Sequence, residues 1–179
     1  MVDDEALATV LAVARSAEQL SNWRARDWPD LALELLLAGI DDPEIAELAG
    51  LPTSVTREDT ELLVASLYEK HGVPLLDPDE AVTLLARLIA TDLRLRPATV
   101  TAPMIRIVAE MAVATHESNL ANQCSRNAEY LDCDCVPVDP GLEARLENLS
   151  PLTLPDSVLQ VLARPIRWTL PQSQPPHGH

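Results

Sequence analysis

The aliphatic residues of this chain recur at intervals of three or four positions, and this spacing constrains the fold more than any other feature. Leu31 and Leu35 make one such pair, and Leu84 and Leu88 make another. Residues spaced in this way lie on one face of an α-helix. No stretch shows the sustained alternation of apolar and polar residues that marks a half-buried strand. The sequence therefore predicts an all-α fold.

The composition indicates what the core of such a fold is made of. The chain has 179 residues, 47% of them hydrophobic, yet it has no Phe and 3% aromatic residues. Such a core is built from Leu, Val, Ile and Ala, and the length suits one domain. We expect a bundle-like or orthogonal assembly of about six to eight helices around a single core.

Helix boundaries are marked by Gly, Pro and acidic residues. Gly39 suits a left-handed cap, Pro43 suits a first helical position, Gly50 suits a helix stop, and Asp77 before Pro78 suits an N-cap. Thr56 followed three residues later by Asp59 suits a capping box. His71, next to the stop at Gly72, is expected to interact with the carbonyls that end its own helix. The predicted helices span approximately residues 3–20, 28–38, 43–49, 57–71, 78–96, 102–116, 140–148 and 156–164.

These helices predict one domain over residues 1–164. Within it, residues 118–139 are expected to form a Cys-containing loop, because the helical pattern lapses there into Asn, Gln, Cys and Asp. The Pro-rich residues 165–179 predict a disordered tail. Residues 28–51 are expected to form a two-helix corner, which Trp28 anchors to the core. For Trp23 the pattern does not decide between a core and a surface position.

The charge of the chain limits its partners. Thirteen Lys and Arg against 28 Asp and Glu give a net charge of −15. This field repels phosphate backbones and anionic lipid, and it attracts basic proteins. No apolar run approaches the roughly 20 residues that span a bilayer. We therefore expect neither a nucleic-acid ligand nor a membrane association.

The main functional prediction is a non-enzymatic module that binds a basic protein through an acidic helical surface. In charge and size the chain resembles the small acidic helical immunity proteins that neutralise basic toxins. The acids that we expect to contact a partner lie at two helix starts: Asp41, Asp42, Glu44, Glu47, Glu58, Asp59 and Glu61. Acids at such positions also stabilise the helix dipole, so capping is the competing interpretation.

A zinc-stabilised domain is one alternative. His116, Cys124, Cys133 and Cys135 are potential ligands within a short stretch, and four such ligands make a tetrahedral site. The spacing H-x₇-C-x₈-C-x-C lacks the paired C-x₂₋₄-C knuckles that make such assignments specific. The competing interpretation is a small buried Cys124 beside two unpaired thiols.

A helix-turn-helix regulator is the other alternative. Gly39, the run 44–46 and Gly50 fall close to the spacing of bacterial DNA-binding modules. The helix that would enter the groove carries Glu58, Asp59 and Glu61 against Arg57, a composition that opposes binding among phosphates.

No enzymatic chemistry is predicted. The chain has no phosphate-binding Gly-rich loop, no Gly-x-Ser-x-Gly elbow, no His-Glu-x-x-His helix and no calcium-binding loop. We therefore expect no cofactor beyond the possible zinc. The N-terminus lacks the pattern of a secretory signal and the cysteines are odd in number, which predicts a cytoplasmic protein with reduced thiols.

One family resemblance accompanies these patterns. Asp41, Pro43, Leu48, Ala49 and Gly50 form an Asp-x-Pro-x-x-x-x-Leu-Ala-Gly pattern that precedes an amphipathic helix. Over about residues 28–112 this arrangement is similar to small actinobacterial helical proteins of unknown function. The resemblance implies a helical fold and a bacterial source, and it implies no activity.

Overall fold

The computed structural model describes residues 3–20, 23–52, 54–96, 108–109 and 148–167. In these ranges the chain forms helices and no strand, which confirms the all-α prediction. The helices are α1 (Asp4–Leu20), the 3₁₀-helix η1 (Ala25–Asp27), α2 (Trp28–Leu37), α3 (Pro43–Ala49), α4 (Arg57–Lys70), α5 (Pro78–Leu95) and α9 (Asp156–Arg167).

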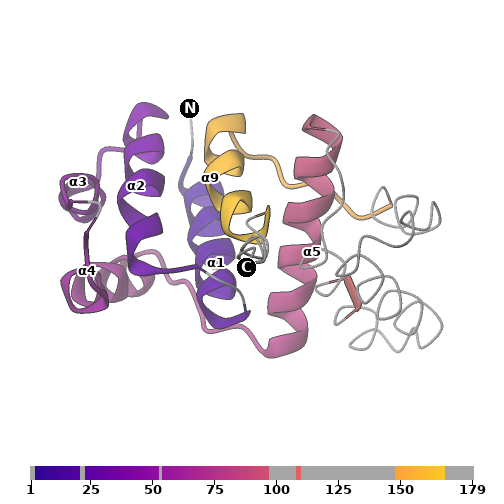
Figure 1. Ribbon diagram of the computed structural model, residues 1–179, viewed down its shortest axis with the longest axis horizontal. Helices are drawn as coiled ribbons and strands as arrows, with labels where there is room; N and C mark the ends of the chain where they lie inside the picture. Colours follow the sequence, from indigo (N-terminus) through magenta and orange to yellow (C-terminus); the bar gives the residue numbers. More distant parts are fainter. Residues whose placement is uncertain (1–2, 21–22, 53, 97–107, 110–147, 168–179) are drawn as a thin grey trace, which may run out of the picture.

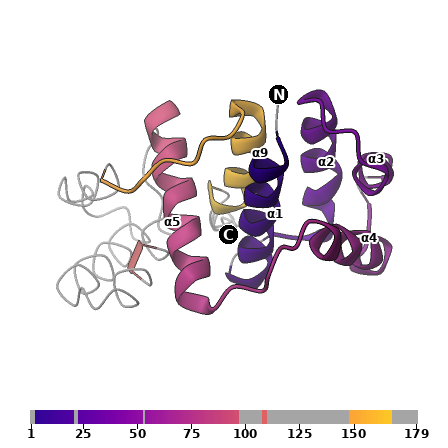
Figure 2. The ribbon, with the colours of Figure 1, turned by 180° about the vertical axis from the view of Figure 1, so that it is seen from behind.

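The helices form a bundle with a corner attached to one side. Helices α1 and α9 lie between α2 and α5, and α3 and α4 lie on the far side of α2 (Figures 1 and 2). Helix α9, which comes last in the sequence, packs against α5, α2 and α1. It therefore fills the middle of a bundle in which its described neighbours, α1, α2 and α5, lie between residues 4 and 95.

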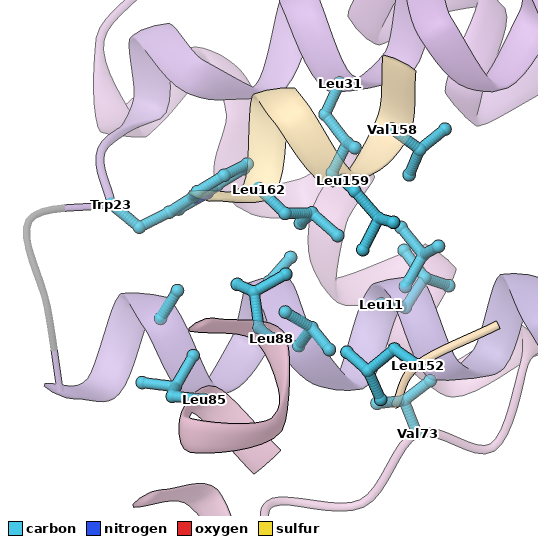
Figure 3. Close-up of a cluster of buried hydrophobic side chains, with 14 of the residues drawn as sticks. Leu11, Trp23, Leu31, Val73, Leu85, Leu88, Leu152, Val158, Leu159 and Leu162 are labelled. Atoms are coloured by element: carbon cyan, nitrogen blue, oxygen red, sulfur yellow. The ribbon is translucent and has the colours of Figure 1, made fainter. Parts of the chain in front are cut away.

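The core is aliphatic, as the composition predicts. Leu11 of α1, Leu31 of α2, Leu88 of α5 and Leu159 of α9 are almost fully buried in one cluster (Figure 3). Burial of a Leu side chain contributes roughly 1.5 to 3 kcal/mol. The core also contains a few aromatic residues, among which the rings of Trp23 and Trp28 meet edge to face with centroids 5.7 Å apart.

The α2–α3–α4 corner is built by the predicted stop and start signals. Gly39 has φ of +94°, the left-handed conformation that ends α2, and Pro43 opens α3. The Asp42 side chain accepts hydrogen bonds from the amides of Glu44 and Ile45, at 3.0 and 3.3 Å. These local features turn the chain twice and bring α4 back against α3.

The segment before α9 is fastened to α5 by side chains of α5. The Thr91 hydroxyl accepts from the Leu152 amide at 2.8 Å, Arg87 donates to the Ser150 carbonyl, and Arg94 donates to the Leu149 carbonyl. Arg96, which caps α5, pairs with Asp92 and with Asp156 of α9. These contacts set the position from which α9 enters the bundle.

One helix end differs from the sequence-based expectation, and one open question is settled. Helix α9 continues to Arg167, so residues 165–167 belong to the helix and not to the predicted tail. Pro165 is buried, and Arg164 pairs with Asp30 at 2.7 Å, so packing outweighs the helix-breaking tendency of Pro. Trp23 is buried in the core.

Several predicted features lie outside the described residues. Val108 and Ala109 are helical, in agreement with the predicted helix over 102–116, and both are buried, but the rest of that helix is not described. The same holds for the predicted loop 118–139, for residues 140–147 of the next helix and for residues 168–179 of the tail.

Candidate functional site

Asp42 lies inside the α2–α3–α4 corner. It is 5% exposed, and its Oδ2 is 2.7 Å from the Lys70 Nζ and 3.3 Å from the His71 Nε2. The carboxylate therefore joins the start of α3 to the end of α4. The prediction that Asp42 contacts a partner is therefore corrected, because its side chain is buried and already paired with Lys70 and His71.

The contacts of Asp42 also set its protonation. Burial by itself raises the pKa of the Asp42 carboxyl, but hydrogen bonds from Lys70, from the Ile45 amide and from His71 act in the opposite direction. Together they lower the pKa from 3.8 to about 2. Asp42 therefore stays ionised through the whole range in which carboxyl groups usually titrate.

Glu44 has a related structural role. Its Oε1 accepts from the Ser66 hydroxyl at 3.1 Å and its Oε2 from the Lys70 ammonium at 3.0 Å. Because Lys70 also pairs with Asp42, the one Lys of the chain is held by two carboxylates. Glu44 is half-buried and ties α3 to α4.

His71 contacts the end of its own helix through its backbone N–H, which donates to the Leu67 carbonyl at 3.0 Å. Its ring has a further partner, because the His71 Nε2 faces Asp42 across the corner at 3.3 Å. The sequence spacing indicates a local partner, whereas the packing of α3 on α4 brings a charged one from 29 positions earlier.

The other predicted partner-binding acids are exposed: Asp41, Glu47, Glu58, Asp59 and Glu61. Among them Asp59 also caps α4, accepting from the Thr56 amide at 2.8 Å and from the Thr56 hydroxyl at 2.7 Å. These hydrogen bonds lower the pKa of the Asp59 carboxyl. The capping box predicted at Thr56 is confirmed.

The exposed face of α4 combines acids with one large apolar side chain. We define the α4 outer face as Glu58, Glu61, Leu62, Ala65 and Glu69, which are all exposed and recur at helical spacing. Leu62 lies at the centre of this face and is 81% exposed. The sequence shows these residues, but it does not show which side of α4 packs against α3. That packing determines that Leu62 faces outward.

A second feature is a cleft of about 740 Å³ between α1, the η1 region and α4, which we term the α1–α4 cleft. Its volume falls within the range of small-molecule sites. Basic, acidic, aromatic and apolar side chains all contribute to it. They are Arg15, Glu18, Gln19, Trp23, Arg24, Ala25, Arg57, Thr60, Glu61, Val64, Ala65, Tyr68 and Leu75.

Glu18 and Tyr68 hold one wall of this cleft. Glu18 Oε1 accepts from the Trp28 indole N–H and Glu18 Oε2 accepts from the Tyr68 hydroxyl, both at 2.9 Å. Burial of the Tyr68 ring, followed by the charge of Glu18, raises the pKa of the Tyr68 hydroxyl, which therefore remains a donor. Both oxygens of Glu18 are thus occupied by neutral donors.

Arg15 is fixed over the same wall. One guanidinium nitrogen donates to the Val73 carbonyl at 2.5 Å, and the guanidinium carbon lies 4.6 Å from the centroid of the Tyr68 ring. This geometry is a cation–π contact. No sequence motif links Arg15 to Tyr68, so the cleft arises from tertiary packing alone.

The geometry of the corner departs from a DNA-binding helix-turn-helix. Residues 50–56 connect α3 to α4, whereas that motif uses a turn of about three or four residues. The exposed side of α4 carries Glu58, Glu61 and Glu69, which adds to the charge argument against contact with phosphates.

The zinc prediction stays a prediction, because His116, Cys124, Cys133 and Cys135 lie outside the described residues. Within the part of the chain that the structure describes, no three His, Cys, Asp or Glu side chains gather in a way that would hold a metal ion. In the same ranges, none of the helices is both long enough and apolar enough to cross a bilayer.

Comparisons with known proteins add no assignment. The chain matches no protein-family model, and searches of curated proteins and of solved structures find no similar protein.

Proposed function

We propose that this protein is a non-enzymatic binding module that holds a basic protein partner on the α4 outer face. The observation that carries the proposal is the placement of Leu62, 81% exposed, among Glu58, Glu61 and Glu69. An exposed apolar residue ringed by charges of one sign combines an anchor for a pocket with electrostatic steering toward a complementary surface.

The acids of the corner divide between structure and binding. Asp42 and Glu44 share Lys70, which offsets one of their two negative charges and holds both carboxylates within the corner. Asp41, which precedes α3, and Glu47 of α3 remain exposed and extend the negative surface. The net charge of −15 strengthens attraction of a basic partner over distances of about a Debye length, 8 to 10 Å at ordinary salt.

The proposal is tested with a synthetic amphipathic helical peptide of Leu and Lys as the probe. The variant Glu58→Gln/Glu69→Gln should weaken its binding about three- to tenfold, and Leu62→Ala should weaken it by a similar factor. Binding measured by titration calorimetry should loosen as salt rises. Neither Glu58, Glu69 nor Leu62 lines the α1–α4 cleft.

The matched control removes two charges elsewhere. Asp4 and Glu5 are exposed in the first turn of α1, whose other half lines the cleft beside α4. The variant Asp4→Asn/Glu5→Gln should bind the peptide as the natural chain does. Equal weakening in both double variants, with no effect of Leu62→Ala, would show that net charge alone acts and would refute the α4 outer face as the binding surface.

A further inference from the structure

The α1–α4 cleft gathers positive charge in a strongly acidic protein. Three of the chain's 13 basic residues, Arg15, Arg24 and Arg57, line it, although the net charge is −15. We propose that this cleft binds a small molecule with a flat apolar body and one anionic group, a carboxylate or a phosphate. This site borders the partner-binding α4 outer face and shares Glu61 and Ala65 with it, but the proposal does not depend on partner binding.

The wall of the cleft suits a flat apolar body. Trp23, Val64 and Tyr68 line it with the small parts of their surface that stay exposed, 5%, 6% and 8%, and Leu75 adds a side chain that is 67% exposed. The Trp23 and Tyr68 rings both meet Trp28 edge to face, with centroids 5.7 and 6.1 Å from it. These contacts hold the rings in fixed orientations, so the surface is formed before a ligand arrives.

The charges of the cleft favour an anion over a cation. Arg24 and Arg57 are exposed, and neither forms a salt bridge with a residue that the structure describes. Planar guanidinium groups bind carboxylate and phosphate oxygens through paired N–H donors. The cleft also contains two carboxylates: both oxygens of Glu18 already accept hydrogen bonds, and Glu61 is exposed at the cleft.

Arg15 adds a positive charge that is held in place beside these two exposed ones. Its contacts with the Val73 carbonyl and the Tyr68 ring hold its guanidinium in place. Since Arg carries five N–H donors, donation to Val73 leaves others for a ligand. The expected complex therefore places the ligand's apolar body on the aromatic wall and its anionic group among the guanidinium groups.

The test compares probes that share one body and differ in charge: 2-naphthoate, 2-naphthyl phosphate and the neutral 2-naphthamide. Binding to the full chain is followed by two-dimensional NMR, with the Trp23 indole N–H as the reporter of the cleft. At least one anionic probe should bind about tenfold more tightly than the amide and shift the Trp23 signal. The tighter of the two anions identifies the preferred head group.

Single variants locate the anionic group. Arg24→Gln and Arg57→Gln should each weaken binding of the preferred anion about three- to tenfold. Arg26→Gln is the matched control, because Arg26 is exposed in η1 but does not line the cleft, and it should change binding less than twofold. Thermal unfolding checks that all three variants fold alike.

Three results would overturn the proposal. These are equal binding of the amide and both anions, equal weakening by the variants at Arg24, Arg57 and Arg26, and absence of a shift at Trp23 at millimolar probe. None of these results bears on the basic peptide, whose binding depends on Glu58, Leu62 and Glu69. Failure of the cleft proposal and failure of the proposed function are thus separable.

Discussion

Single residues of this protein carry roles that their sequence context only half reveals. Asp42 is recognisable as a helix cap, and its Oδ1 does accept hydrogen bonds from two backbone amides of α3. The structure adds Lys70 and His71 as partners from the end of α4. One carboxylate therefore serves a local and a long-range function, and its lowered pKa reports the second.

The variant Asp42→Asn tests the long-range part, because Asn caps helices about as well as Asp. The folded pKa of about 2 lies below the unfolded value of 3.8, so ionised Asp42 stabilises the fold above about pH 4. We expect Asp42→Asn to lose about 2 kcal/mol of unfolding free energy near pH 6. Urea unfolding measures this loss.

That difference should shrink as the pH falls from about 4 through 2, because the natural chain then protonates Asp42 as well. Asp41→Asn is the control, since Asp41 is exposed and should change stability by less than about 0.5 kcal/mol. A pH-independent difference between the natural chain and Asp42→Asn would contradict the role of the ion pair.

At the scale of elements, two glycines end helices in the α2–α3–α4 corner, and their backbone conformations differ. Gly39 ends α2 with φ of +94°, in the region that L side chains avoid. Gly50 ends α3 with φ of −82°, an ordinary right-handed conformation. Both are helix stops in the sequence, but only the structure separates the obligatory glycine from the replaceable one.

The pair Gly39→Ala and Gly50→Ala tests this distinction. An added Cβ meets no atom within 4 Å at Gly39, so the expected loss of about 1 kcal/mol comes from backbone strain alone. Gly50→Ala should be neutral or stabilise by up to about 1 kcal/mol, because Ala lowers the entropy of the unfolded chain. Chemical denaturation measures both, and equal losses would contradict the assignment.

At the scale of the whole molecule, the last helix completes the core. Val158, Leu159 and Leu162 of α9 are buried among residues of α1, α2 and α5 (Figure 3). Arg164 and Asp156 add ion pairs to α2 and to the end of α5. The stability of the bundle therefore depends on contacts between residues more than one hundred positions apart.

Truncating one core and one surface leucine tests this dependence. Leu159→Ala leaves a cavity at a site that is 1% exposed and should lose about 2 to 5 kcal/mol of unfolding free energy. Leu62→Ala, on the α4 outer face, should change it by less than about 0.5 kcal/mol. A small loss at Leu159 would show that the bundle closes without α9.

The sequence by itself determined the helical class, the aliphatic core and most local boundaries, because these follow from periodicity and from caps within a few residues. The Thr56–Asp59 capping box, the left-handed Gly39 and the Asp77 cap of α5 are examples. Where the predicted boundary erred, at Pro165, a tertiary contact overrode a local rule.

Only the tertiary structure decided which acids remain available and where a cleft exists. Asp42 and Glu44 look equivalent to Glu58 and Glu61 in the sequence. The packing of α3 on α4 pairs Asp42 and Glu44 with Lys70, whereas Glu58 and Glu61 stay exposed. Arg15 and Tyr68 meet across more than fifty positions because helices from distant segments share one edge. Such proximity depends on how helices pack, and no local spacing encodes it.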